Sequence, residues 1–108
     1  MKVIVRTHHL DIPAWQLTDL ARRLELAFSR LAGAVRVVEC MVTDINGPRG
    51  GVDKHVRLRV SGRHVGTIVV EELGVDSLAT VGGACVLAKR ALLRRLARRR
   101  AFAPVSVH

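Results

Sequence analysis

Aromatic residues are scarce in this 108-residue chain: they make up 3% of the sequence, and tyrosine is absent. Proteins that bind single-stranded nucleic acid by base stacking need exposed rings, so the composition argues against that mode of binding. Apolar residues still make up 49% of the chain, and the core is therefore predicted to be aliphatic. A chain of this length forms one domain and can bury a core without a disulfide or a metal.

Long apolar runs and cysteine motifs are also missing. No stretch approaches the roughly 20 apolar residues of a membrane-spanning helix, and the N-terminal run MKVIVRTHH is too short for a signal peptide. We therefore interpret the chain as cytoplasmic and expect no membrane partner. The two cysteines, Cys40 and Cys85, lack CxxC spacing. We expect both to be small buried apolar side chains, with a metal or redox role as the alternative.

Acidic residues are few, because nine Asp and Glu stand against eighteen Lys and Arg, for a formal net charge of +9. Residues 1–75 hold eleven basic and eight acidic residues, a net charge of +3. Residues 76–108 hold seven basic residues and one acidic residue, a net charge of +6. This bias favours a polyanionic partner, with nucleic acid the first choice and an anionic membrane the second.

The basic residues of the last third lie within twelve positions, and no acidic residue follows Asp76 to relieve their repulsion. Arg90, Arg94 and Arg98 recur every fourth residue, so they line one edge of a predicted helix. Arg forms forked hydrogen bonds to phosphate that Lys cannot form. The pattern indicates a nucleic-acid-binding helix, with a merely solvated helix face as the alternative. The basic residues of this segment are Lys89, Arg90, Arg94, Arg95, Arg98, Arg99 and Arg100.

Hydrophobic periodicity predicts the element order β-α-β-β-β-α. Short β-branched and alternating runs predict the strands, and apolar residues at steps of three and four predict the helices. The predicted strands span residues 2–6, 35–44, 54–61 and 65–71, and the predicted helices run from residue 12 to 31 and from 77 to about 100.

Polar residues and glycines predict where these elements begin and end. Asp11 is predicted to cap the first helix and Gly33 to end it. Asp76 or Ser77 is predicted to cap the second helix. Between the second and third strands, residues 46–51 predict a turn-rich connection, and residues 61–64 predict a hairpin turn.

These elements predict an α+β fold with a four-stranded mixed sheet and two helices packed on one face. The helix in the first crossover makes the first two strands parallel neighbours, and the remaining strands are expected to be antiparallel. In the third strand, apolar residues alternate with His55, Arg57 and Arg59. These three residues are therefore expected on the sheet face that the helices leave exposed.

Constellations that would support catalysis or metal binding are weak. The four residues His8, His9, His55 and His64 lack an HxxxH or CxxC context, so no metal site is expected. A Cys–His nucleophile pair would need a third group that cannot be named. The GPRGG loop lacks the Lys-Ser/Thr of a nucleotide-binding loop, although Arg49 could contact phosphate. We expect no enzyme activity, no cofactor and no small-molecule substrate.

Two stretches resemble a known family. VTDINGPRGGVDKHVRLRV (residues 42–60) and VVEELGVDSLAT (residues 69–80) leading into a basic helix, together with the element order, resemble the ribosome hibernation-promoting factor family, also called the ribosome-associated inhibitor family. The resemblance covers residues 1 to about 100. In one departure, the DSLATVG segment at residues 76–82 lacks the Tyr and the second Asp usual at the start of the family's last helix.

The resemblance implies a bacterial protein that binds the small ribosomal subunit in the mRNA and tRNA channel and blocks translation initiation in resting or stressed cells. It implies that residues 1–101 form a single ribosome-binding domain, while residues 102–108 are expected to form a loose tail. We expect a monomer. The alternative is a generic module that binds double-stranded RNA or DNA.

The expected contacts with ribosomal RNA lie on both helices, in the 46–51 loop and on the third strand. The resemblance implies those on the helices and Lys54, while the charge pattern suggests the others. The predicted RNA-binding residues are Arg22, Arg23, Arg30, Arg49, Lys54, Arg57, Arg59, Lys89, Arg90, Arg94, Arg95 and Arg98.

Overall fold

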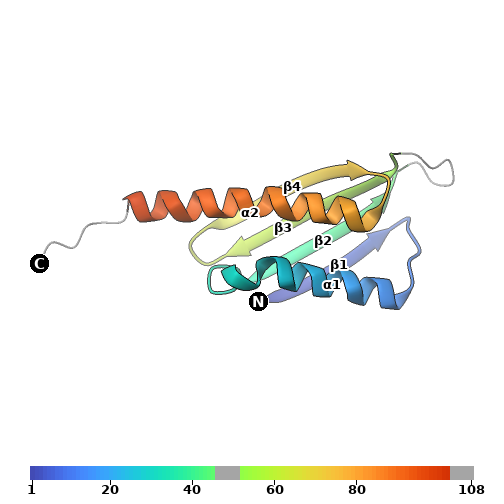
Figure 1. Ribbon diagram of the computed structural model, residues 1–108, viewed down its shortest axis with the longest axis horizontal. Coiled ribbons are helices and arrows are strands. Elements are labelled where there is room, and N and C mark those ends of the chain that lie inside the picture. The colour runs from blue at the N-terminus through green and yellow to red at the C-terminus, as the bar shows by residue number, and fades with distance from the viewer. Residues whose placement is uncertain (46–51, 103–108) are drawn as a thin grey trace, which may run out of the picture.

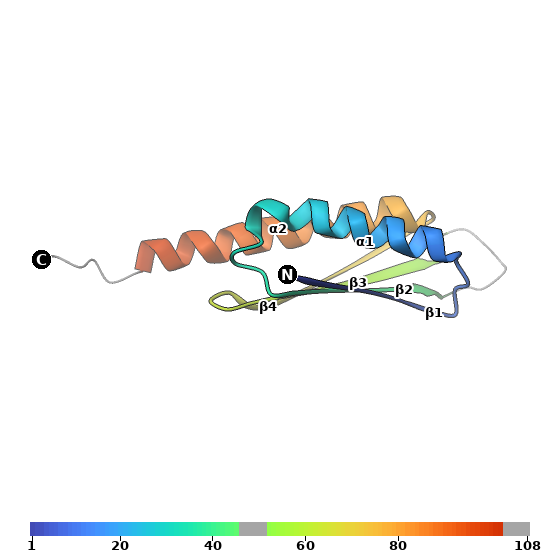
Figure 2. The same ribbon diagram turned by 90° about the horizontal axis from the view of Figure 1, so that it is seen from below.

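The computed structural model describes residues 1–45 and 52–102, in which two helices cover one face of a four-stranded sheet (Figures 1 and 2). The connection at 46–51, with Arg49, and residues 103–108 lie outside the described residues. Of the tail predicted at residues 102–108, only Phe102 is described, and it belongs to the last helix. The elements are β1 (Lys2–His8), α1 (Ala14–Phe28), a 3-10 turn η1 (Ser29–Leu31), β2 (Val37–Asp44), β3 (Lys54–Gly62), β4 (Gly66–Gly74) and α2 (Ser77–Phe102).

The predicted α+β fold and its mixed sheet are confirmed. The strand order is β1-β2-β3-β4, with β1 and β2 parallel and the other two pairs antiparallel. Both helices lie on the same face of the sheet, and the opposite face is uncovered (Figure 2). The uncovered face follows from the count of elements, because two helices suffice to cover one side of a four-stranded sheet.

The first helix begins and ends differently from the prediction. Asp11 is not its cap: Pro13 occupies the N-cap position, with no side-chain cap hydrogen bond, and the helix starts at Ala14. Gly33 does not end it either. The helix ends at Phe28, where the backbone N–H and the hydroxyl of Ser29 both donate to the carbonyl of Leu26 and tighten the chain into η1.

The core lies between the sheet and the helices, and apart from Phe28 and the two cysteines it is aliphatic, as the composition predicted. From β3, Val56, Leu58 and Val60 point toward the helices and are fully buried, so the alternation read from the sequence is confirmed. Burying a side chain of this size stabilises the fold by about 1.5–3 kcal/mol. The other large side chains that are fully buried are Phe28, Leu20, Leu24, Leu92, Val38, Val42, Val81 and Cys40.

Asp76 caps α2, as predicted, because its carboxylate accepts the backbone N–H of Ala79 at 2.9 Å. The Thr80 side chain then packs so closely on Gly74 that any larger residue at Gly74 would collide with it. The helix runs two residues past the predicted end, and its C-terminal turns project beyond the sheet (Figure 1). Within the described residues, neither helix has the length and hydropathy needed to cross a bilayer.

Gly82 and Gly83 lie in the first half of α2, where each costs about 1 kcal/mol relative to alanine. Neither glycine is required by packing, because a Cβ atom at either position would meet nothing within 4 Å. Gly62 differs from this pair, since a Cβ there would collide with the carbonyl of Ala34 and the side chain of Val65. The stability of the fold therefore does not explain why glycine occupies positions 82 and 83.

Candidate nucleic-acid interface

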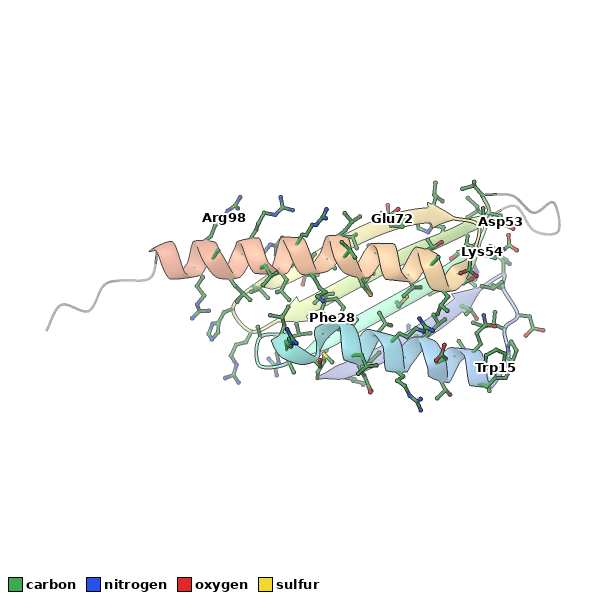
Figure 3. The ribbon with its side chains drawn as sticks, in the orientation of Figure 1. Trp15, Phe28, Asp53, Lys54, Glu72 and Arg98 are labelled. Atoms are coloured by element: carbon green, nitrogen blue, oxygen red, sulfur yellow. The ribbon has the colours of Figure 1, made fainter. Side chains whose placement is uncertain are left out.

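The outer edge of α2 presents the arginines that recur every fourth residue. Arg90, Arg94 and Arg98 are all exposed, and Arg98 lies on the edge of α2 away from α1 (Figure 3). The three side chains share a helix edge because residues four apart are neighbours on a helix surface. The negative end of the helix dipole lies at the C-terminus of α2 and stabilises cations in the last turn, which include Arg99.

Further cations from other elements gather at the same end of the molecule. The first residues of β1 and β2, the turn between β3 and β4, the end of α1 and the C-terminal half of α2 all meet there (Figure 1). Backbone hydrogen bonds join these segments: Lys2 N–H donates to Arg36 O at 2.8 Å, and Arg36 N–H donates to Ser61 O at 2.8 Å. We define the basic end as Lys2, Arg30, Arg36, Arg63, Arg94, Arg95, Arg98 and Arg99.

Acidic residues gather at the opposite end. Asp76 precedes α2, Asp44 ends β2, Asp53 precedes β3, and Asp11 lies in the connection between β1 and α1. The molecule is thus polarised along its long axis as well as strongly cationic. A polarised charge distribution orients a protein as it approaches a polyanion, so the basic end should face the polyanion first.

Lys54 lies in an ion-pair cluster at the acidic end and not with the other predicted residues. Its Nζ is 2.8 Å from Asp53 Oδ1 and 3.7 Å from Asp44 Oδ2, and its side chain is 17% exposed. The hydrogen bond to Asp53 raises the pKa of Lys54 above its usual range. Its predicted contact with RNA stays a prediction, but two carboxylates already compensate its charge.

Arg95 and Arg23 also have partners within the protein. The Nη1 atom of Arg95 donates to the backbone carbonyls of Val65 and Thr67 at 2.6 and 2.9 Å. These two hydrogen bonds connect the C-terminal half of α2 to the turn between β3 and β4. Arg23 forms an exposed ion pair with Asp19 at 3.2 Å, a type of pair that contributes little and exchanges readily.

The remaining predicted residues are spread over three surfaces. Arg22 is exposed on α1, and Lys89 is partly buried on the side of α2 that borders α1. Arg57 and Arg59 are exposed on the uncovered face of the sheet, as predicted.

On that face the two arginines border a hollow of about 220 Å³, together with Arg6 of β1. Met41 of β2 lies opposite Arg57, and Glu39 lies opposite Arg59. This face is therefore cationic with an apolar centre.

Sequence reasoning missed Lys2, Arg6, Arg36 and Arg63. Each is an isolated cation in its own segment, so no local charge run identifies it. The predicted topology could have identified Lys2, Arg36 and Arg63. Parallel β1 and β2 must both begin at the end of the sheet where the turn between β3 and β4 lies. The position of Arg6 follows from strand alternation, which places it on the face with Arg57.

The structure does not bring the histidines together. His8 and His9 lie at the end of β1, with ring centroids 4.0 Å apart, and His64 lies in the turn at the other end of the sheet. His55 is 3.7 Å from Glu71 on the uncovered face. Among the described residues, no group of three or more His, Cys, Asp or Glu side chains is arranged to hold a metal ion.

Cys40 and Cys85 are buried, as expected, with 2% and 7% of their surfaces exposed. Burial raises the pKa of Cys40 to about 12, with a further increase from nearby Cys85. Burial likewise raises the pKa of Cys85 to about 11, partly offset by Lys89. Because the thiolate is the nucleophile, neither side chain suits nucleophilic catalysis at neutral pH.

We expect both thiols to resist alkylation at neutral pH while the protein is folded, and to react quickly in denaturant. The reason is that burial removes both access and thiolate character. Mass spectrometry after timed exposure to iodoacetamide measures this directly. Rapid labelling of either cysteine under native conditions would contradict their burial in the core between the sheet and the helices.

No family model matches the sequence, and no curated protein matches it. Solved structures with the same fold class are nevertheless found. A ribosomal subunit interface protein from Coxiella burnetii aligns with a TM-score of 0.64 and 16% identity, over 89% of this chain and 99% of that one. The N-terminal domain of Protein Y from Thermus thermophilus aligns with a TM-score of 0.64 and 16% identity, over 84% and 96%. At this identity the alignments show a shared fold.

Proposed function

We propose that this protein is a member of the ribosome hibernation-promoting factor family that binds the small ribosomal subunit. The basic end carries the proposal, because cations from three elements and two connections converge there on a fold shared with a ribosomal subunit interface protein. The sequence resemblance at residues 42–60 and 69–80 supports the same family. The protein would act by occupying the mRNA and tRNA channel, without catalysis, cofactor or small-molecule substrate.

The proposed interface includes the outer edge of α2, the exposed arginines of α1 and the uncovered sheet face. Arginine-rich surfaces suit ribosomal RNA because guanidinium groups bind phosphate in a forked geometry. Each phosphate contact releases counterions, so binding should weaken steeply with salt. We propose that the protein acts in the cytoplasm as a monomer of one domain, under stress conditions that slow translation.

The second candidate is a generic module for double-stranded RNA or DNA. The edge formed by Arg90, Arg94 and Arg98 favours it, because one basic helix edge is sufficient to follow a duplex backbone. A generic module would use one surface and would show no preference for assembled subunits. The two candidates therefore differ in competition behaviour.

Sedimentation with purified small subunits at physiological salt tests the proposal. We expect the protein to pellet with the subunits and to be released by mRNA and initiator tRNA, because all three would occupy one channel. Excess RNA duplex should displace it only weakly. Release by duplex as effective as release by mRNA and tRNA would favour the generic module, and no pelleting would refute the proposed function.

A further inference from the structure

A groove of about 340 Å³ lies between α1 and α2 on their solvent side. Its walls are mainly apolar: Leu26 and Ala27 come from α1, and Gly82 and Val86 come from α2. One cation from each helix, Arg23 and Lys89, borders it. The groove lies apart from the sheet face and from the basic end, but Arg23 and Lys89 are also among the predicted RNA contacts.

Val81 and Cys85 at this groove are buried, but apolar side chains at its rim are largely exposed. Leu26 is 67% exposed and Val86 is 49% exposed, and Leu93 farther along α2 is 51% exposed. On α2, Gly82, Val86, Lys89 and Leu93 follow one another at steps of four, three and four, the spacing of a seam that packs against another helix. Contiguous exposed apolar surface of this kind marks an interaction site.

Gly82 keeps the groove open. The residue is exposed in the interior of a helix, and no atom lies within 4 Å of where its Cβ would be. Glycine weakens a helix relative to alanine, so its presence here needs a reason outside the fold. The missing side chain leaves room for a side chain of a partner between the two helices.

We propose that this groove binds an amphipathic helix of another protein, with acidic residues beside the apolar face of that helix. The charges select this occupant. Lys89 lies at the groove, and Arg23 is held only by an exposed ion pair with Asp19. An acidic helix would satisfy these cations while its apolar residues cover Leu26 and Val86.

The same observations disfavour two other occupants. RNA phosphates would gain nothing from exposed leucine and valine side chains and would leave them poorly covered. A second copy of this chain, docked groove to groove, would bring Arg23 and Lys89 of one copy against those of the other. Like charges at that distance oppose association.

A pair of synthetic peptides of about 18 residues, long enough to form an isolated helix, tests the proposal. Both carry leucine at the spacing of the seam, and they differ only in glutamate or lysine beside it. By fluorescence anisotropy we expect the glutamate peptide to bind at least tenfold more tightly than the lysine peptide. Amide chemical-shift changes should centre on Leu26, Gly82 and Val86.

Gly82→Leu should fill the groove and weaken binding of the glutamate peptide at least tenfold, while the melting temperature equals or exceeds that of the wild type. Gly83→Leu is the matched control, because it makes the same change one position away, outside the groove lining. This control should bind the peptide like the wild type. Unchanged peptide binding by Gly82→Leu would overturn the proposal, as would equal affinity for both peptides or no binding of either.

The ribosome experiment separates this inference from the proposed function. Gly82→Leu should sediment with small subunits like the wild type, because it fills the apolar part of the groove and leaves Arg23 and Lys89, the two groove cations among the proposed RNA contacts, unchanged. Loss of sedimentation in this variant would assign the groove to RNA and contradict the inference. Dimerisation that Gly82→Leu abolishes would assign it to a second copy and also contradict it. Peptide binding by a protein that does not sediment with subunits would refute only the proposed function.

Discussion

Replacing Arg90, Arg94 and Arg98 together by Glu should reduce binding to small subunits to near background. Each replacement changes the charge by two, so the formal net charge falls from +9 by six to +3. The loss of binding free energy should exceed that from removing three phosphate contacts, because the glutamates also repel phosphate along the whole edge of α2. Each lost phosphate contact lowers the salt slope of log Kobs by about 0.7–0.9.

The fold should tolerate this change. All three side chains are exposed, and within the described parts of the chain none of them has an ion-pair partner. Surface substitutions of this kind usually change stability by about 0.5 kcal/mol or less each. Circular dichroism and thermal melting should therefore match the wild type.

The measurement is a sedimentation titration at several salt concentrations, with the triple lysine variant of the same positions as its control. That variant keeps the charge but loses the forked hydrogen bonds, so it should bind with intermediate affinity. If the glutamate variant pellets with subunits like the wild type, the outer edge of α2 is a solvated face. The electrostatic argument for this helix would then be wrong.

The fold was predictable because its elements follow simple periods. Alternation in β3 places Val56 and Leu58 against the helices, and the parallel pairing of β1 with β2 follows from the helix between them. The ends of α1 were not predictable in the same way. Asp11 and Gly33 are ordinary cap residues by type, but the chain geometry at Pro13 and Ser29 decided the boundaries.

The candidate interface was predictable only where it is local in the sequence. The run from Lys89 to Arg100 is visible as a charge cluster, whereas Arg36 and Arg63 join it only through the topology of the sheet. Residue type alone also cannot tell a free cation from a paired one. Lys54 and Arg95 look like phosphate contacts in the sequence, yet both bind oxygen atoms of their own chain.

The double variant Arg57→Ala and Arg59→Ala should weaken small-subunit binding by about 1–2 kcal/mol, since hydrogen bonds to charged groups contribute about 1.5–3 kcal/mol and exposed ones less. This corresponds to a five- to thirtyfold rise in Kd. Both side chains are exposed and alternate along β3 with the buried Val56, Leu58 and Val60, so they lie on the sheet face opposite the helices. A protein can use both of these faces only where RNA surrounds it, as in the channel that the family resemblance implies.

A generic duplex binder would use the basic edge of α2 and leave the sheet face in solvent. Binding to a free RNA duplex, measured in parallel, should therefore respond to the double variant only through long-range charge. The variant Arg57→Lys and Arg59→Lys is the matched control, because it keeps that charge and should recover part of the subunit affinity. A double alanine variant that binds subunits as tightly as the wild type, at matched salt, would mean that these arginines only balance Glu39 and Glu71, their cross-strand neighbours. The uncovered face would then have no part in the ribosomal interface, and the generic module would become the better proposal.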